Sequence, residues 1–210
     1  SGGGFTRDVT KLLENYEGLR LNAYPDPASG GEPITIGVGA TRYPPGFRFG
    51  RSKVMLGDTI TKEEAYMIKD YDVKRHTKIA KDRVGEDIWP KLPENVKFAL
   101  ISKAFNYGTI YNGALRAVDE GVKTGDYSGL AEYYRNVLAK HNNAINSWRR
   151  NDEAGIIASG KSNRSGMTFS TTLSAPPVIP PSMPSSPSFG PGFDSDDRAQ
   201  SERLNLIKLM

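Results

Sequence analysis

The sequence predicts an α+β protein in which a long helix joins a small β lobe to a larger helical lobe. A glycine-punctuated segment at 34–39, ITIGVG, alternates as a strand does. A helical pattern of about two dozen residues then begins at the capping box formed by Thr61 and Glu64 and stops at Gly85. Further helical patterns follow from Pro93 onwards, and they predict the larger lobe.

An amphipathic helix is predicted at the start of the chain. Its apolar positions follow the i, i+3, i+4, i+7 spacing and are Val9, Leu12, Leu13 and Tyr16. Glu17 directly follows this stripe, and Gly18 supplies a helix stop. A carboxyl group at the inner edge of a helix end is partly removed from water, so we expect this position to favour the protonated, acidic form of Glu17.

Two more polar residues follow at even intervals. Asp26 lies between two prolines in a predicted turn, where its carboxylate stays hydrated and ionised. Thr35 lies in the predicted strand, whose alternation points its hydroxyl away from the flanking isoleucines. One acidic and one ionised carboxyl group are the pair that glycoside hydrolysis requires. A hydroxyl at Thr35 would then hold a water molecule against Asp26.

The remaining elements are expected to build the two sides of a cleft. Residues 43–58 mix proline, glycine and aromatic residues, which predicts a loop or hairpin that completes the β lobe. Beyond the long helix, further helices are predicted at 93–107, 112–124, 128–140 and 144–158. Packing of these helices would place the carboxyl groups across a cleft from helical residues.

Composition excludes several classes of site. The 210 residues leave room for one domain and an appendage, and the absence of cysteine excludes disulfides, thiol catalysis and cysteine-based zinc sites. The two histidines, His76 and His141, are predicted to lie on helix surfaces, so we expect no metal and no cofactor. No segment has the roughly 20 apolar residues of a membrane span. No basic run with interleaved aromatic residues predicts a nucleic-acid partner.

Three stretches carry a family resemblance. They are YEGLRL at 16–21, AYPDP at 23–27 and GEPITIGVG at 31–39. In residues and in spacing they resemble the N-terminal signature of the phage-type lysozymes, glycoside hydrolase family 24, to which the T-even phage lysozymes belong. The resemblance implies a lysozyme-like fold and cleavage of the β-1,4 bond between N-acetylmuramic acid and N-acetylglucosamine in peptidoglycan.

The resemblance also implies roles for individual residues. Glu17 corresponds to the general acid, Asp26 to the second catalytic carboxylate, and Thr35 to the threonine that positions the attacking water. It further implies inversion at the anomeric carbon, with carboxyl groups about 6.5–9.5 Å apart. The chain departs from the family at Ala40, where many members have a histidine. We expect this change to remove a stabilising ion pair and to leave the chemistry intact.

Two segments in the helical half resemble the family more loosely. AFNYG at 104–108 is similar to a Phe-Asn-x-Gly segment that lines the sugar cleft, which makes Phe105 and Asn106 candidate substrate contacts. WRRNDE at 148–153 resembles an Arg-Arg-x-x-Glu stretch, which implies that Arg150 or Arg149 pairs with Glu17. The resemblance covers about residues 9–160, some three quarters of the chain.

The end of the chain has a different composition. Residues 171–193 contain seven of the fourteen prolines, which predicts an extended Pro/Ser-rich C-terminal tail. The expected organisation is a linker or tag remnant, a lysozyme-like catalytic domain, a Pro/Ser-rich extended linker and a short docking segment. Their expected bounds are 1–4, 5–165, 166–193 and 194–210.

Several biological roles remain open. We expect a lysozyme of the virion, in the tail or baseplate, whose C-terminal tail contacts phage structural proteins and which acts in the bacterial cell wall. One alternative is an endolysin that waits in the host cytoplasm for release through a holin. A second is a lytic transglycosylase, which would not need a water held by Asp26 and Thr35. A third is a non-catalytic structural tail protein, which would need none of the three residues in combination.

Overall fold

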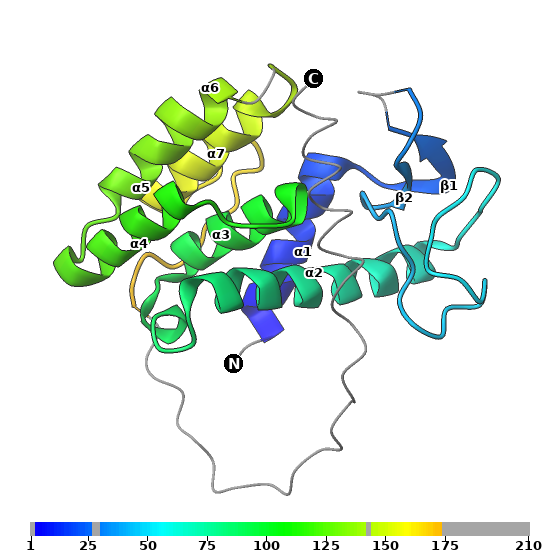
Figure 1. The fold of residues 1–210 in the computed structure, drawn as a ribbon, viewed down its shortest axis with the longest axis horizontal. Helices are drawn as coiled ribbons and strands as arrows, with labels where there is room; N and C mark the ends of the chain where they lie inside the picture. The colour runs from blue at the N-terminus through cyan, green and yellow to red at the C-terminus, as the bar shows by residue number, and fades with distance from the viewer. Residues whose placement is uncertain (1–2, 27–29, 142–143, 174–210) are drawn as a thin grey trace, which may run out of the picture.

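The computed structural model describes residues 3–26, 30–141 and 144–173, and the structural statements below concern these ranges. A small β lobe and a larger helical lobe lie at opposite ends of α2 (Lys62–Val84), as Figure 1 shows. The predicted α+β architecture with a long connecting helix is therefore confirmed. Within the described ranges, no helix is both long and apolar enough to cross a membrane.

The β lobe is built on one antiparallel pair of strands. In that pair, β1 (Arg20–Pro25) runs beside β2 (Ile34–Gly37), with Tyr24 opposite Thr35. The loop that follows closes over a small apolar core. Members of this core are Ile34, Ile36, Ala40, Tyr43, Phe47, Val54, Ile60, Ala65 and Ile68.

Aromatic rings and an ion pair hold the loop of the β lobe together. The Tyr43 ring stacks on Phe47, with centroids 4.6 Å apart. Arg51 donates from both terminal nitrogens to the Asp58 carboxylate, at 2.9 and 2.5 Å, and Asp58 also accepts from the Tyr43 hydroxyl. The hydrogen bonds from Arg51 lower the pKa of Asp58 to about 2. These contacts therefore hold the loop in one arrangement beside α2.

The long helix α2 begins and ends where its local signals predict. Thr61 and Glu64 form the reciprocal capping box, and the helix stops at Gly85, whose φ of +104° suits a residue without a side chain. Its 23 residues span about 35 Å. The predicted surface position of His76 is wrong: the side chain is buried because α3 packs on this face of α2 and the Phe105 ring covers it, 4.8 Å away.

The helical lobe contains the helices that the periodicity predicts and two elements that it does not predict, a 3₁₀ turn and a π-helical segment. They are α1 (Gly3–Glu17), a short 3₁₀ turn (Trp89–Lys91), α3 (Glu94–Tyr107), α4 (Asn112–Thr124), α5 (Ser128–Glu132), a π-helical segment (Tyr133–Leu138), α6 (Ala139–His141) and α7 (Ala144–Ser159). The single helix predicted at 128–140 is the continuous run of α5, the π-helical segment and α6. The first helix, α1, begins at Gly3, inside the segment that is predicted to be a linker or tag remnant.

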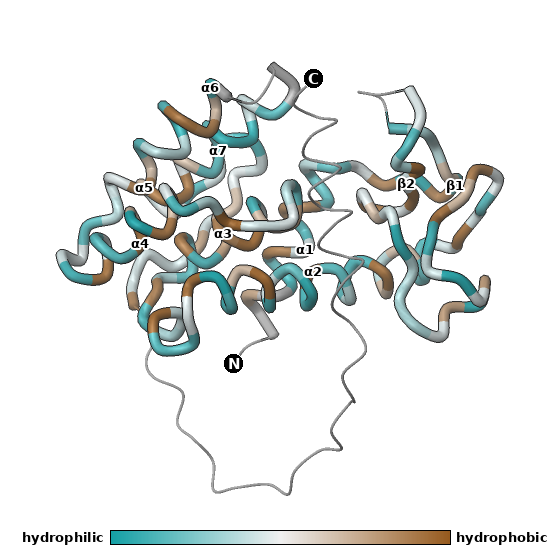
Figure 2. The backbone as a smooth tube through the Cα atoms, viewed as in Figure 1, coloured by the Kyte–Doolittle hydropathy of each residue, from teal (hydrophilic) through white to brown (hydrophobic). Residues whose placement is uncertain are grey.

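The apolar core of the helical lobe is centred on α3. Its fully buried members include Leu12, Val73, Leu100, Ile101 and Ile156, which come from α1, α2, α3 and α7. Figure 2 shows hydrophobic stretches recurring along α3, with hydrophilic segments on the outer turns of α2 and α4. This core fixes α1 and α7 against α3, and these three helices carry much of the site described below.

The packed chain extends beyond the predicted domain boundary at residue 165. Phe169 stacks on Phe98 of α3, with ring centroids 4.5 Å apart, and the backbone N–H of Asn95 donates to Ser170 O. Leu173 forms an isolated β-bridge with Pro93. Residues 166–173, predicted to begin the linker, therefore lie against the helical lobe. The predictions for residues 174–193 and for the docking segment lie outside the described residues.

Candidate active site

Glu17 lies where the two lobes meet. It is the last residue of α1, and the N–H of Gly18 closes the helix on Glu14 O. One carboxylate oxygen, Oε1, accepts a hydrogen bond from Arg149 Nη1 at 2.6 Å. The side chain is 24% exposed, so the group keeps access to solvent.

Gly39 brings the β lobe against the same carboxyl group. A Cβ atom at this position would lie 3.0 Å from Glu17 Oε2. The φ of Gly39 is +75°, a conformation that side chains disfavour. Glu17 is therefore enclosed between a side-chain-free turn of the β lobe and an arginine of the helical lobe.

Arg149 is itself held on several sides. Its guanidinium donates to Ser102 Oγ at 3.3 and 3.1 Å and lies 3.4 Å from Glu153 Oε1. The face of the Tyr16 ring lies 4.9 Å away. Because Arg149 is 2% exposed, it presents a fixed donor to Glu17.

The arginine that reaches Glu17 is thus Arg149 and not Arg150. Consecutive residues of a helix point about 100° apart, so only one of the two can face α1. Arg150 is fully buried, donates to Asn106 Oδ1 at 3.2 Å and lies 3.0 Å from Glu153 Oε1. The buried Glu153 therefore forms ion pairs with both arginines.

Asp26 and Thr35 lie together at the end of the strand pair. Asp26 directly follows β1 and is half-buried, and its backbone N–H donates to Gly31 O at 3.0 Å. Thr35 is 8% exposed and its hydroxyl donates to Pro33 O at 3.4 Å. Residues opposite each other in an antiparallel pair point to the same face of the sheet, so Thr35 shares its face with Tyr24.

Tyr24 links the predicted residues electrostatically. Burial raises the pKa of its hydroxyl, and the negative charges of Glu17 and Asp26 raise it further. Both carboxyl groups therefore act on the Tyr24 hydroxyl, and Tyr24 lies opposite Thr35 in the strand pair. Tyr24 is not among the residues predicted from the sequence, although its place opposite Thr35 follows from pairing the two strands.

Phe105 and Asn106 lie at the C-terminal end of α3. The Phe105 ring is half-buried, with Lys69 Nζ 3.6 Å from its centroid and His76 packed beside it. Asn106 is half-buried too, and its side-chain oxygen is the acceptor for Arg150. Buried basic side chains therefore contact both residues that are predicted to bind substrate.

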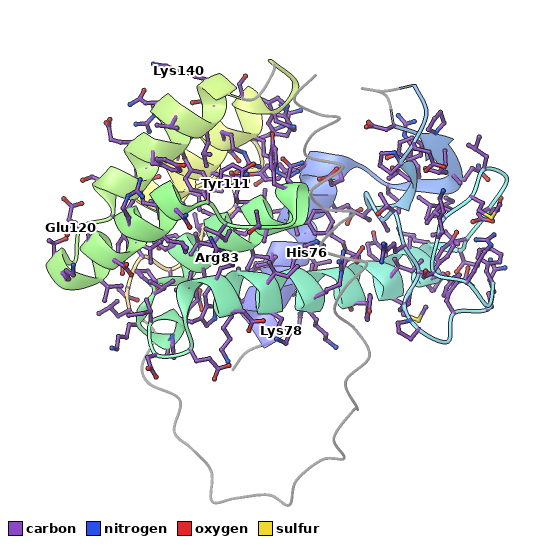
Figure 3. All side chains as sticks on the ribbon, viewed as in Figure 1. His76, Lys78, Arg83, Tyr111, Glu120 and Lys140 are labelled. Carbon is purple, nitrogen blue, oxygen red and sulfur yellow. The ribbon has the colours of Figure 1, made fainter. Side chains whose placement is uncertain are left out.

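A layer of buried ionisable residues lies beneath this region. We call it the charged layer; each member is at most 6% exposed, and the members are Lys69, Asp72, His76, Arg149, Arg150 and Glu153. Burial lowers the pKa of His76, labelled in Figure 3, to about 3 and raises that of Asp72 to about 6. No cluster of three or more histidine, cysteine or carboxylate side chains suited to a metal occurs within the described ranges.

A separate cavity lies between the loop of the β lobe and α2. Its volume is about 510 Å³, and its walls include Arg42, Tyr43, Arg51, Tyr71 and Arg75. None of the predicted site residues lines it. Three arginines line this cavity, and two of them, Arg51 and Arg75, are paired with Asp58 and Asp72.

The chain is similar to known proteins over most of the described domain. Residues 14–160 match the family model for phage lysozyme. An endolysin from Escherichia coli O157:H7 phage FAHEc1 is similar in structure, with a TM-score of 0.54, 24% identity and coverage of 71% of this chain and 90% of that one. A P22 lysozyme variant gives 0.51 and 25%, with 70% and 93% covered. No curated protein matches the chain.

Proposed function

The chain belongs to the phage lysozyme family and is a lysozyme, and on that premise we propose that it cleaves the β-1,4 bond between N-acetylmuramic acid and N-acetylglucosamine with Glu17 as general acid. The position of Glu17 supports this proposal most. It lies at the junction of the lobes, between Gly39 and Arg149, and a second carboxylate, that of Asp26, acts with it on the Tyr24 hydroxyl.

In the proposed reaction the two carboxyl groups act on opposite ends of the bond that breaks. Glu17 gives its proton to the glycosidic oxygen as the bond from that oxygen to the anomeric carbon breaks. A water molecule held by Asp26 and the Thr35 hydroxyl attacks the anomeric carbon, and Asp26 accepts the proton that the water loses. The products are two shorter glycan chains, one with a new reducing end of inverted configuration.

The neighbours of Glu17 support a directional acid. Arg149 holds Oε1, so the proton for the leaving group would lie on Oε2, the oxygen next to Gly39. We assign Arg149 the role of orienting this carboxyl group and Arg150 that of holding Asn106 through its side-chain oxygen. Phe105 would offer an apolar platform to a sugar ring, and Asn106 would hydrogen-bond to it.

A comparison of the wild type with Glu17→Gln tests the assignment. Turbidity loss on purified peptidoglycan should disappear in the variant, with at least a hundred-fold lower rate. Glu14→Gln is a matched control on the same helix, because the Glu14 side chain accepts from the Tyr66 hydroxyl at 3.0 Å and has no role in the proposed reaction. It should clear peptidoglycan at close to the wild-type rate.

Product analysis in the same assay separates the other chemistries. New reducing ends would support hydrolysis, whereas 1,6-anhydromuramyl products would identify a lytic transglycosylase. If neither the wild type nor Glu17→Gln clears peptidoglycan, a non-catalytic structural protein would be favoured. Normal clearing by Glu17→Gln would exclude Glu17 as the acid.

The place of action is a separate part of the proposal. The proline-rich composition of 171–193 supports a virion lysozyme whose tail contacts phage structural proteins. The likeness to an endolysin supports release from the host cytoplasm through a holin instead. Detection of the polypeptide in purified particles would support the virion role. Its absence from particles would favour the endolysin.

A further inference from the structure

Lys69 is a buried cation beside the candidate active site. It lies on α2 and is 1% exposed. Its ammonium group donates to Val38 O at 3.3 Å and lies 3.6 Å from the centroid of the Phe105 ring. Lysine is rarely buried to this extent, because removing its charge from water costs several kcal/mol. Two weak partners do not offset that cost, so the position calls for an explanation in terms of the site.

The two contacts of Lys69 belong to different lobes. Val38 directly precedes Gly39, the residue that lies against Glu17, and it belongs to the β lobe. Phe105 is on α3 of the helical lobe. Lys69 therefore connects the turn that encloses the acid to a predicted substrate contact.

The charges around Lys69 come from three helices, and α3 contributes the Phe105 ring. Glu17 and Glu14 face it from α1, Asp72 from its own helix and Arg149 from α7. Burial lowers the pKa of Lys69 to about 7, and the carboxylates of Glu17 and Asp72 oppose part of this change. Lys69 therefore carries its charge below about pH 7.

We propose that Lys69 is a positioning residue that fixes the Val38–Gly39 turn against Glu17 and that its ammonium charge acts on the Glu17 carboxyl group. The inference rests on the proposed role of Glu17 as general acid. A cation near a carboxyl group favours the ionised form. Lys69 thus holds the geometry that the acid needs, and its charge interacts with the same carboxyl group.

Three variants separate charge from geometry. Lys69→Met removes both the charge and the hydrogen bond, Lys69→Gln keeps a donor for Val38 O without the charge, and Lys69→Arg keeps the charge. In the two neutral variants the alkaline limb of kcat/KM on labelled peptidoglycan should move up by about half a pH unit or more. The limb should stay at the wild-type position in Lys69→Arg.

Lys103 provides a matched control. It is also fully buried, on α3, with its ammonium group 3.4 and 4.1 Å from the rings of Tyr107 and Tyr111. Lys103→Met should therefore change thermal stability and leave the alkaline limb in place. Identical limbs in the wild type and both neutral Lys69 variants would overturn the proposal and reduce Lys69 to a packing residue.

A titration that compares the wild type with Glu17→Gln completes the test where a Lys69 variant does not fold. Linkage between two sites is reciprocal, so replacing Glu17 must alter the titration of Lys69 if Lys69 alters Glu17. In NMR titrations of the lysine ammonium groups, the midpoint of Lys69 should fall in Glu17→Gln. An unchanged midpoint would contradict the proposal. The titration of Lys69 does not depend on hydrolytic activity. A wild type without hydrolytic activity would therefore contradict the proposed function and not the titration.

Discussion

On α3, Leu100 and Ile101 lie in the apolar core, while the next residue, Ser102, donates to Glu153 and accepts from Arg149 in the charged layer. The two regions are buried to the same degree and share the same helices. In the core any side chain of suitable size contributes, because apolar contacts are not directional. In the charged layer each group depends on the presence of its partner.

The difference between the core and the charged layer is seen in the buried polar atoms of the charged layer. Within the described ranges, Arg150 Nε and Nη1 and Glu153 Oε2 are buried without a hydrogen-bond partner. Such atoms cost free energy of folding, and an apolar replacement of the whole group is often more stable. We infer that the core supplies the stability which the charged layer consumes in holding Glu17, Phe105 and Asn106.

The largest effect is expected from Arg149→Met, which breaks the charged layer at its centre. It leaves Glu17 without its donor and Glu153 with one fewer cation, and it should cost about 3–5 kcal/mol of unfolding free energy. The rate on peptidoglycan should fall at least a hundred-fold. Chemical denaturation and turbidity assays measure the two effects.

Arg48→Met is the control for Arg149→Met. Arg48 pairs with Glu64 at 2.5 Å, but its side chain is 49% exposed. Because the pair is exposed to solvent, its loss should lower the free energy of unfolding far less than Arg149→Met does. Equal costs for the two arginine variants would show that the charged layer is no more sensitive than a surface pair.

The next largest effect should come from Leu100→Ala in the core. Truncation of a fully buried leucine leaves a cavity, and the free energy of unfolding should fall by about 2–5 kcal/mol. The rate per folded molecule should stay within about two-fold of the wild type, since the site residues keep their partners. A loss of activity at temperatures where the variant is fully folded would erase the distinction between the two regions.

The smallest expected effect is the change in folding stability at acidic pH. Since the pKa of His76 is lowered to about 3 in the folded state, the unfolded chain binds more protons below pH 6.5, and stability from this group is lost as pH falls. Asp72 acts in the opposite direction: its raised pKa, about 6, means that stability from it grows as pH falls through 6 towards 4.

Melting temperatures at pH 7 and pH 4.5 separate the two groups. His76→Gln should reduce the loss of stability over this range by about 2 kcal/mol, and Asp72→Asn should increase it. Parallel melting curves for both variants and the wild type would show that neither group titrates differently on unfolding.

Local signals explain which parts of the fold the sequence predicts well. The capping box at Thr61 and the glycines at 85, 108 and 125 end or begin helices through their own backbone geometry, so the bounds of α2, α3 and α4 follow from short stretches. The burial of His76 depends on α3, and the packing of Phe169 depends on Phe98, far away in sequence. Periodicity carries no information on such contacts.

The site divides in the same way. The residue types and spacing around Glu17, Asp26 and Thr35 are visible in the sequence. Which of two adjacent arginines faces Glu17 depends on the rotation of α7 relative to α1, and sequence does not specify that rotation. Lys69 was missed because a lysine among the charged residues of a long helix resembles a solvated position.

The bridge between Leu173 and Pro93 fixes the C-terminal point at which another segment can be attached to this domain. It lies at the beginning of α3, whereas Phe105 and Asn106 lie near the end of that helix. About twelve helical residues separate the two, a distance of roughly 18 Å along the axis. A module fused directly after Leu173 would therefore begin at the opposite end of α3 from Phe105 and Asn106, which makes this position suitable for attaching a binding module or an immobilising anchor.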